Sequence, residues 1–216
     1  INLYKNFKIL KYWGTGKRAA ADGTIWEIFE RNILSEKHIR YGINGAIGYY
    51  HVSDLYIALF SKFIPCGVWE GVHILDLLMN ETDINPHILH SDTQGQSETI
   101  FGLSFLLGIE LMPRIRNWKN LKFYKPVKKR RYKHIEELFD AKIDWEIIKI
   151  HLPDMLRVAH SIKMGRITPT TILKKLGSYS RKNKLYQAFS ELGKAIRTGF
   201  LLKYISDVEL RRTIQE

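Results

Sequence analysis

Short apolar runs, typical of β-strands, recur through the first half of the chain. Residues 39–52 are rich in β-forming side chains and punctuated by glycines, and residues 55–63 form a second such run. Together they predict a hairpin beside an earlier strand that ends near Asp22. Two further short runs, at residues 84–90 and 109–113, complete a set of five predicted strands.

Apolar residues at helical spacing separate the later strands and dominate the second half of the chain. We predict a helix after the third strand and another after the fourth, because each segment gathers its apolar side chains on one face. From residue 135 onward almost the whole chain has this pattern. The predicted helices cover residues 67–80, 97–108, 152–164, 168–177 and 180–216, another begins at 143–145, and the last helical stretch has possible breaks at Gly193, Gly199 and Ser206.

The order of these elements is strand, strand, strand, helix, strand, helix, strand. That is the order of the ribonuclease H-like fold, although other α/β folds share parts of it. We therefore expect an α/β protein with a ribonuclease H-like mixed sheet core over residues 1–113. A basic, largely α-helical insertion is expected over 114–178, followed by C-terminal helices over 179–216 that return to the core.

The charge balance points to a polyanionic partner. Of the 216 residues, 34 are Lys or Arg and 22 are Asp or Glu, which gives a net charge of +12. Nucleic acid is favoured over an anionic membrane as the partner. The longest apolar run, residues 55–60, is too short to span a bilayer, and the first residues do not resemble a signal peptide.

Basic residues concentrate just after the predicted core. Five of the six residues in 128–133 are Lys or Arg, and aromatic residues are interleaved with the basic residues that precede them. This mixture suits phosphate contacts combined with stacking on bases or sugars, although a solvated loop is the alternative. The candidate DNA-contacting residues are Arg114, Arg116, Lys128, Lys129, Arg130, Arg131, Lys133, Arg181 and Lys182.

Two aspartates are the candidate metal ligands. Asp92 lies in residues 90–97, His-Ser-Asp-Thr-Gln-Gly-Gln-Ser, at the predicted tip of a strand where a polar loop opens into a helix. Ligands gather at the carboxyl ends of strands in open α/β sheets, and oxygen ligands suit a hard cation. The alternative is an aspartate that only caps the next helix. Asp22 ends the first predicted strand, where a simple Asp-Gly turn is the alternative.

Five segments, in the same order and spread over nearly the whole chain, resemble the catalytic domain of transposases of the Tn-three family of replicative transposons. They are residues 21–24, 90–97, 111–118, 176–183 and 204–212. The resemblance implies a ribonuclease H-like core and metal-dependent cleavage at transposon ends followed by strand transfer into target DNA. It also implies two magnesium ions held by two aspartates and one glutamate. Asp22 matches the first aspartate and Asp92 the second.

The third acid is where this chain departs from the family pattern. In the family a glutamate in an Asn-Lys-x-Glu context follows the segment matched by 204–212, and this context is absent here. Glu209 and Glu216 do not fit it, so we expect the third ligand beyond residue 216 and expect this fragment to bind metal poorly or not at all. His90 and Gln94 are candidates to support the ligands, with a core histidine as the alternative for His90.

Two other functions remain open at this point. A DNA-binding or assembly module without chemistry of its own would also use the positive charge, and a ribonuclease H-like nuclease or resolvase would share the carboxylate site. The transposase hypothesis implies DNA partners, both transposon inverted-repeat ends and target, a homodimer assembled on DNA, and no membrane.

Overall fold

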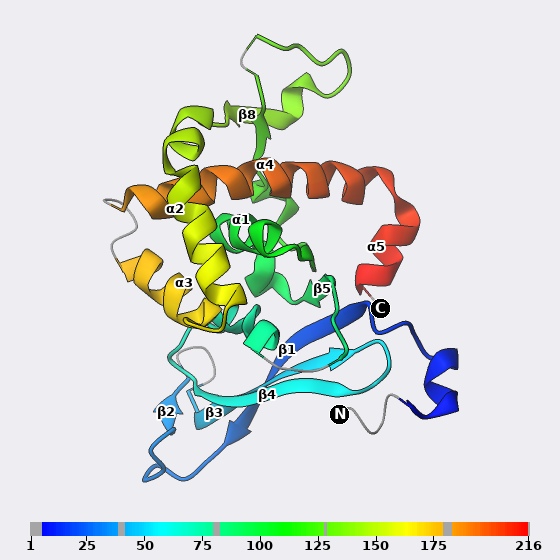
Figure 1. Ribbon diagram of the computed structural model, residues 1–216, viewed down its shortest axis with the longest axis vertical. Coiled ribbons are helices and arrows are strands. Elements are labelled where there is room, and N and C mark those ends of the chain that lie inside the picture. Colours follow the sequence, from blue (N-terminus) through cyan, green and yellow to red (C-terminus); the bar gives the residue numbers. More distant parts are fainter. Residues whose placement is uncertain (1–5, 39–41, 80–82, 128, 179–182, 216) are drawn as a thin grey trace.

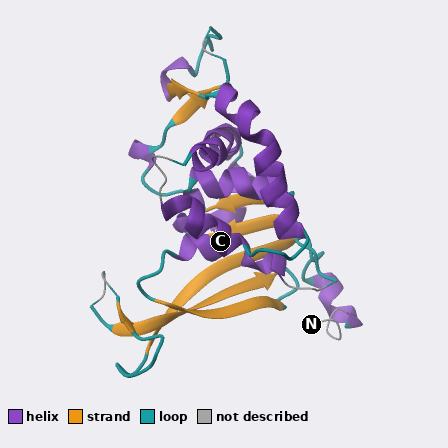
Figure 2. Ribbon diagram, turned by 60° about the vertical axis from the view of Figure 1, so that its left-hand side comes forward, coloured by secondary structure: helices purple, strands orange, loops and turns teal. Residues whose placement is uncertain are grey.

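The computed structural model describes residues 6–38, 42–79, 83–127, 129–178 and 183–215. A mixed sheet forms one part of the molecule, and most of the helices gather beside it (Figure 1, Figure 2). Within the described part of the chain, no helix combines the length and the apolar character that crossing a bilayer needs.

In the described residues six strands form the main sheet, the five predicted and the short β2, which was not predicted. β3 pairs antiparallel with both β1 and β4, whereas β1, β5 and β6 run parallel in that order. An antiparallel meander that continues into parallel strands through helical crossovers is the mixed sheet expected of a ribonuclease H-like core. The strands are β1 (Arg18–Glu27), β2 (Glu36–Lys37), β3 (Asn44–Ser53), β4 (Ala58–Pro65), β5 (Ile88–Ser91) and β6 (Glu110–Pro113).

Five α-helices, all after β5, lie in the described part of the chain. They are α1 (Glu98–Leu107), α2 (Trp145–Lys163), α3 (Pro169–Ser178), α4 (Lys184–Ser206) and α5 (Val208–Gln215). The short 3-10 helices are η2 (Lys8–Tyr12), η3 (Glu70–His73), η4 (Asp76–Met79), η5 (Thr93–Gln96), η6 (Trp118–Asn120) and η7 (Glu136–Leu138). The predicted helix between the fourth and fifth strands is α1, and α3 also lies where the sequence predicted it.

The structure corrects three of the helix predictions. Helices expected to begin separately near residues 143 and 152 form the single helix α2, which contains Pro153 and buries Ile148 and Met155 on either side of it. Burial of both residues offsets the hydrogen bond that a proline removes. Of the three possible breaks in the last helical stretch, only the one at Ser206 is present. Helix α4 continues through both Gly193 and Gly199. Residues 139–142, expected to be helical, form β8 (Phe139–Lys142), which pairs with β7 (Phe123–Lys125).

The helix predicted over residues 67–80 is also wrong, since η3 and η4 replace it. Residues 71–77 are all buried, and buried side chains rather than a continuous helical ladder fix this segment. His73 Nδ1 lies 2.8 Å from Asp76 Oδ2, and the Thr170 hydroxyl donates to Asp76 Oδ1 at 2.5 Å. These contacts attach the segment to the first turn of α3.

The long helix α4 lies across α1 and α2, and α5 then turns back toward β1 and β5 (Figure 1). The apolar stripe predicted on α4 is covered as expected, because Phe189, Leu192 and Phe200 are buried and Leu185 and Ile196 pack against the core. The C-terminal helices therefore join the core to the segment inserted after β6.

Candidate active site

Asp22 and Asp92 lie side by side where β5 ends against the middle of β1. In the parallel pair of β1 and β5, Ala21 lies opposite Ser91. Asp22 and Asp92 are the residues that directly follow these two. Both carboxylates line one pocket of about 280 Å³, which we call the carboxylate pocket. The two aspartates thus lie close together, one on β1 and one directly after the neighbouring β5. That their carboxylates can share a cation stays a prediction.

Asp92 both caps a helix and faces the carboxylate pocket. Its Oδ1 accepts a hydrogen bond from the Gln94 backbone N–H at 3.0 Å, which caps η5, so the capping alternative is also correct. Burial raises the pKa of Asp92, the negative charge of Asp22 raises it further, and the Gln94 amide acts in the opposite direction. A divalent cation between the two carboxylates would remove this repulsion, so the donor set suits a metal ion.

Helix α5 closes one side of the carboxylate pocket. Its residues Thr213 and Ile214 line the pocket beside Arg114, and the Arg114 guanidinium donates to the Gln215 carbonyl at 2.9 Å. The C-terminal helix α5 therefore ends beside the two aspartates. Glu209 points elsewhere, since it is exposed and pairs with Arg212 at 2.8 Å, and Glu216 lies outside the described residues.

A third carboxylate near the two aspartates was missed by the sequence reasoning. Glu70, the first residue of η3, is half-buried beneath Gly23, where a Cβ would collide with Glu70 Oε2. Burial, followed by the charges of Asp92 and Asp22, raises the pKa of Glu70 to about 7. The available signal was the position of Glu70 in the connection from β4 to β5, because that connection has to cross β3 and β1 to reach β5.

Polar groups around the carboxylates tie the neighbouring loops together. The Trp69 indole N–H donates to the Gln94 side-chain oxygen at 2.6 Å, so η3 and η5 are linked. His90 lines the carboxylate pocket, and its pKa is lowered by burial and by Arg18. The supporting roles expected of Gln94 and His90 stay predictions. Among the residues that the structure describes, no three His, Cys, Asp or Glu side chains are arranged to hold a metal ion.

The candidate DNA-contacting residues that the structure describes fall into two groups, the exposed basic run at residues 129–133 and the two arginines that follow β6. Lys129, Arg130, Arg131 and Lys133 are exposed, with the Arg130 guanidinium 5.5 Å from the centre of the Tyr132 ring. Arg116 lines a polar hollow beside η5, close to the carboxylate pocket that Arg114 lines. Lys128, Arg181 and Lys182 lie outside the described residues. The predicted exposure of the basic run is confirmed for its described cations.

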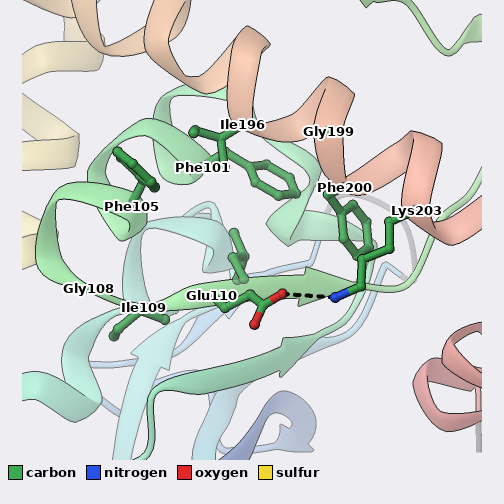
Figure 3. A pocket seen from close by; sticks show the side chains of 10 residues that line it. Phe101, Phe105, Gly108, Ile109, Glu110, Ile196, Gly199, Phe200 and Lys203 are labelled. Atoms are coloured by element: carbon green, nitrogen blue, oxygen red, sulfur yellow. Dashed lines mark hydrogen bonds and ion pairs between the residues drawn. The ribbon is translucent and has the colours of Figure 1, made fainter.

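A second pocket, of about 390 Å³, lies between α1, β6 and α4 and is mostly apolar (Figure 3). Phe101, Phe105 and Phe200 form much of its wall, and Lys203 approaches Glu110 to 3.5 Å at one side. This pocket is larger than the carboxylate pocket but has a single carboxylate in its wall, which is paired with a lysine. It therefore lacks the clustered oxygen ligands that phosphoryl-transfer chemistry needs.

Comparison with known proteins agrees with the geometry. The family model described as "Tn3 transposase DDE domain" matches residues 1–216. The transposase for transposon Tn1546 of Enterococcus faecium is 36% identical over 217 residues, covering 100% of this chain and 22% of the relative. The transposase for transposon Tn501 of Pseudomonas aeruginosa is 35% identical over 207 residues, 94% of this chain and 21% of the relative.

A more distant relative, the transposase for transposon gamma-delta of Escherichia coli K12, is 30% identical over 217 residues, 99% of this chain and 22% of the relative. The chain thus spans about a fifth of the length of these relatives. No solved structure matches it. Members of the family generally use a divalent metal ion. The full-length family match, together with Asp22 in the middle of β1 and Asp92 directly after β5, which line one pocket, establishes that this chain belongs to the Tn3 transposase DDE domain family.

Proposed function

We propose that this chain provides the catalytic core of a replicative transposase, which cleaves DNA strands at transposon ends and joins them to target DNA. The observation that carries the proposal is the pair Asp22 and Asp92, which line one pocket where β5 ends beside the middle of the adjacent parallel strand β1. A rigid sheet that holds two carboxylates in place is the support that a metal-dependent phosphoryl transfer requires.

In this proposal Asp22 and Asp92 are magnesium ligands, and a third acid from beyond residue 216 completes a site for two ions. Magnesium bound there supplies activation of the attacking water or 3′-hydroxyl and stabilisation of the leaving oxygen. The chain's own residues prepare the site. The Gln94 amide holds one oxygen of Asp92, and Arg114 fixes the end of α5 at the pocket wall.

The proposed partner is DNA, both the transposon ends and the target, bound by a homodimer in the bacterial cytoplasm. The exposed basic run and the net charge of +12 support this partner. We also propose the division of the chain into a core over 1–113, an insertion over 114–178 and returning C-terminal helices over 179–216. The structure of α4, which packs on both α1 and α2, supports a close association of the three parts.

The decisive experiment is product analysis with the intact protein, labelled DNA that carries the transposon end, target DNA and magnesium or manganese. The proposal expects nicks at the 3′ ends of the transposon and a product in which those ends are covalently joined to target. Cleavage without joined product would instead indicate a nuclease or resolvase. A mobility shift without cleavage would indicate a DNA-binding module.

A second prediction concerns the exposed basic run. Replacing Lys129, Arg130, Arg131 and Lys133 with glutamine should flatten the salt dependence of DNA binding, because each phosphate contact contributes a slope of about 0.9 in log K against log salt. If all four contact DNA, we expect a decrease of about 3 to 4 in the slope. Filter binding or fluorescence anisotropy between low and moderate salt measures it.

The control removes the same number of exposed charges elsewhere, from α2 and α3. Glutamine replacements at these sites change the net charge equally but leave the basic run intact. A slope that falls as much in the control as in the test protein would show that only net charge matters, and a slope unchanged in both would make the run a solvated loop. The control positions are Lys149, Lys163, Lys174 and Lys175.

A further inference from the structure

We propose that the polar hollow beside η5 binds a phosphodiester of the DNA strand, one that lies within a few nucleotides of the bond to be cleaved. This hollow, of about 340 Å³, lies between η5, the segment that follows β6, and α4. The inference rests on the proposed function and adds to it a site that positions the substrate. The lining includes Thr93, Gln96, Arg116, Asn117, Asn120 and Arg197.

The polar hollow offers hydrogen-bond donors and no carboxylate. Two guanidinium groups, three side-chain amides and one hydroxyl line it, and none of the described residues in its wall is Asp or Glu. A guanidinium group binds phosphate oxygens through two parallel hydrogen bonds, and Asn, Gln and Thr side chains make many of the other phosphate contacts in protein–DNA complexes. This set of groups therefore suits an anion that carries several oxygens.

Several of these donors are not used within the protein. In the described part of the chain, no group pairs with the Arg116 guanidinium or with the side chains of Gln96 and Asn120. Asn117 precedes η6 with its backbone in the left-handed region, at φ 58°, and its side chain does not make the capping hydrogen bond that asparagine favours at this position. These side chains are thus available to a ligand.

Arg197 is the strongest sign that the ligand is an anion. Its side chain is only 13% exposed, and its buried Nε has no hydrogen-bond partner among the described residues. Its one ion pair with those residues, to Glu98, is long at 3.4 Å, and Glu98 already accepts from the Tyr124 hydroxyl at 2.8 Å and the Ser190 hydroxyl at 3.0 Å. A buried cation with incomplete partners is costly, and a phosphate in the polar hollow would supply the missing negative charge.

Two chain segments connect the polar hollow to the carboxylate pocket. Thr93 lines the hollow and directly follows Asp92, which lines the pocket. After β6, Arg114 lines the pocket and Arg116 lines the hollow, and both are exposed with the buried Ile115 between them. Successive phosphates of one DNA strand are about 3.4 Å apart along the helix axis, which is close to the rise per residue of an extended chain. A strand whose scissile phosphate lies at the two aspartates therefore reaches the hollow with a neighbouring phosphate.

The test uses labelled transposon-end DNA in which single phosphates are replaced by neutral methylphosphonates. Fluorescence anisotropy without metal measures binding to the intact protein, for the parent and for Arg116→Gln. In the parent, a neutral linkage at one position within about three nucleotides of the transposon's 3′ end should weaken binding about tenfold, because charge-assisted hydrogen bonds are lost there. Arg116→Gln should weaken binding by a similar factor and should be less sensitive to the neutral linkage at that position alone, since both changes remove the same contact.

Arg166→Gln is the matched control, because it removes the charge of an exposed arginine that lies between α2 and α3. It should respond to every neutral linkage as the parent does. Arg116→Lys keeps the charge but not the fork of donors, so it should recover only part of the affinity. Additive effects of Arg116→Gln and the neutral linkage at every position would overturn the inference, and so would coupling at a position far from the 3′ end.

Inorganic phosphate distinguishes a DNA site from a site for the free ion. Phosphate that binds the protein, seen by phosphorus NMR and lost in Arg116→Gln, would overturn the assignment to DNA if no DNA phosphate couples to Arg116. These measurements need no metal, so they are independent of catalysis. Coupling without any nicking by the intact protein would leave the phosphate site in place and refute the proposed function. Nicking and strand transfer without coupling would refute the phosphate site alone.

Discussion

Asp22→Asn and Asp92→Asn should each reduce metal-dependent strand cleavage by the intact protein at least about a thousandfold, equivalent to about 4 kcal/mol of lost transition-state stabilisation. The two carboxylates face the same pocket, so neither can replace the other as a bridge between cations. Asparagine keeps the shape of the side chain but removes the negative charge that a divalent cation requires. Single-turnover nicking of labelled transposon-end DNA measures the effect.

The fold should survive both substitutions. In the Asp92→Asn variant the new side-chain amide oxygen would still accept the hydrogen bond from the Gln94 backbone N–H, because asparagine caps helices as well as aspartate does. Asp154→Asn is a suitable control, since Asp154 lies on the exposed face of α2 and pairs with Arg157. The control should cleave at the parental rate with a parental circular dichroism spectrum. Full cleavage by either site variant would remove that aspartate from the metal centre.

The sequence was sufficient to predict the meeting of Asp22 and Asp92 because local signals and strand order agree there. Each aspartate follows a short run of apolar or small residues, and a parallel pairing of those runs brings the two residues together. The prediction that the first strand ends near Asp22 is wrong, because β1 continues to Glu27 through its pairing with β3. The one further assumption was the order of the strands in the sheet. The order of the elements along the chain favours a mixed sheet with the first strand in the centre, as observed. The register, with Ala21 opposite Ser91, could be obtained only from the structure.

Glu70 could not be recognised in the same way. Apolar spacing over residues 67–80 is compatible with an α-helix, but the segment is buried on all sides, and side-chain hydrogen bonds from His51 and Thr170 compete with helical ones. His51 Nε2 lies 2.8 Å from the Ile74 carbonyl, which an α-helix would use internally. Interactions with residues distant in sequence therefore override the local pattern, and they also determine which way Glu70 points.

The glycines of α4 also show that a local sequence pattern cannot predict every element. A glycine in a helical pattern lowers helix propensity, so Gly193 and Gly199 both resembled breaks. The structure distinguishes them by their surroundings. Gly193 lies against the backbone of α1, where an added Cβ would overlap the Glu98 carbonyl, and Gly102 of α1 meets the Phe189 carbonyl of α4 in the same manner. An added Cβ at Gly199 would have no atom within 4 Å apart from its chain neighbours and the adjacent backbone of α4 itself.

Gly193→Ala should therefore destabilise the protein severely, by about 3 kcal/mol or more, because the two helix backbones must separate to admit one methyl group. This contact joins the two most extensively packed helices, and Phe101 and Phe200 meet beside it with ring centres 5.7 Å apart. A small displacement of α4 would thus loosen several buried side chains together. Urea unfolding followed by tryptophan fluorescence measures the free energy of unfolding.

Gly199→Ala is the matched control on the same helix. With open space around it, the added methyl group meets nothing, and the gain in helix propensity should stabilise the protein by about 0.5 to 1 kcal/mol. The two substitutions are chemically identical, so the opposite signs isolate the close approach of α1 and α4. Equal effects of the two substitutions would mean that the helices do not cross at Gly193 as closely as the structure has them. The position of α5 against the carboxylate pocket would then need revision as well, because α4 carries it there.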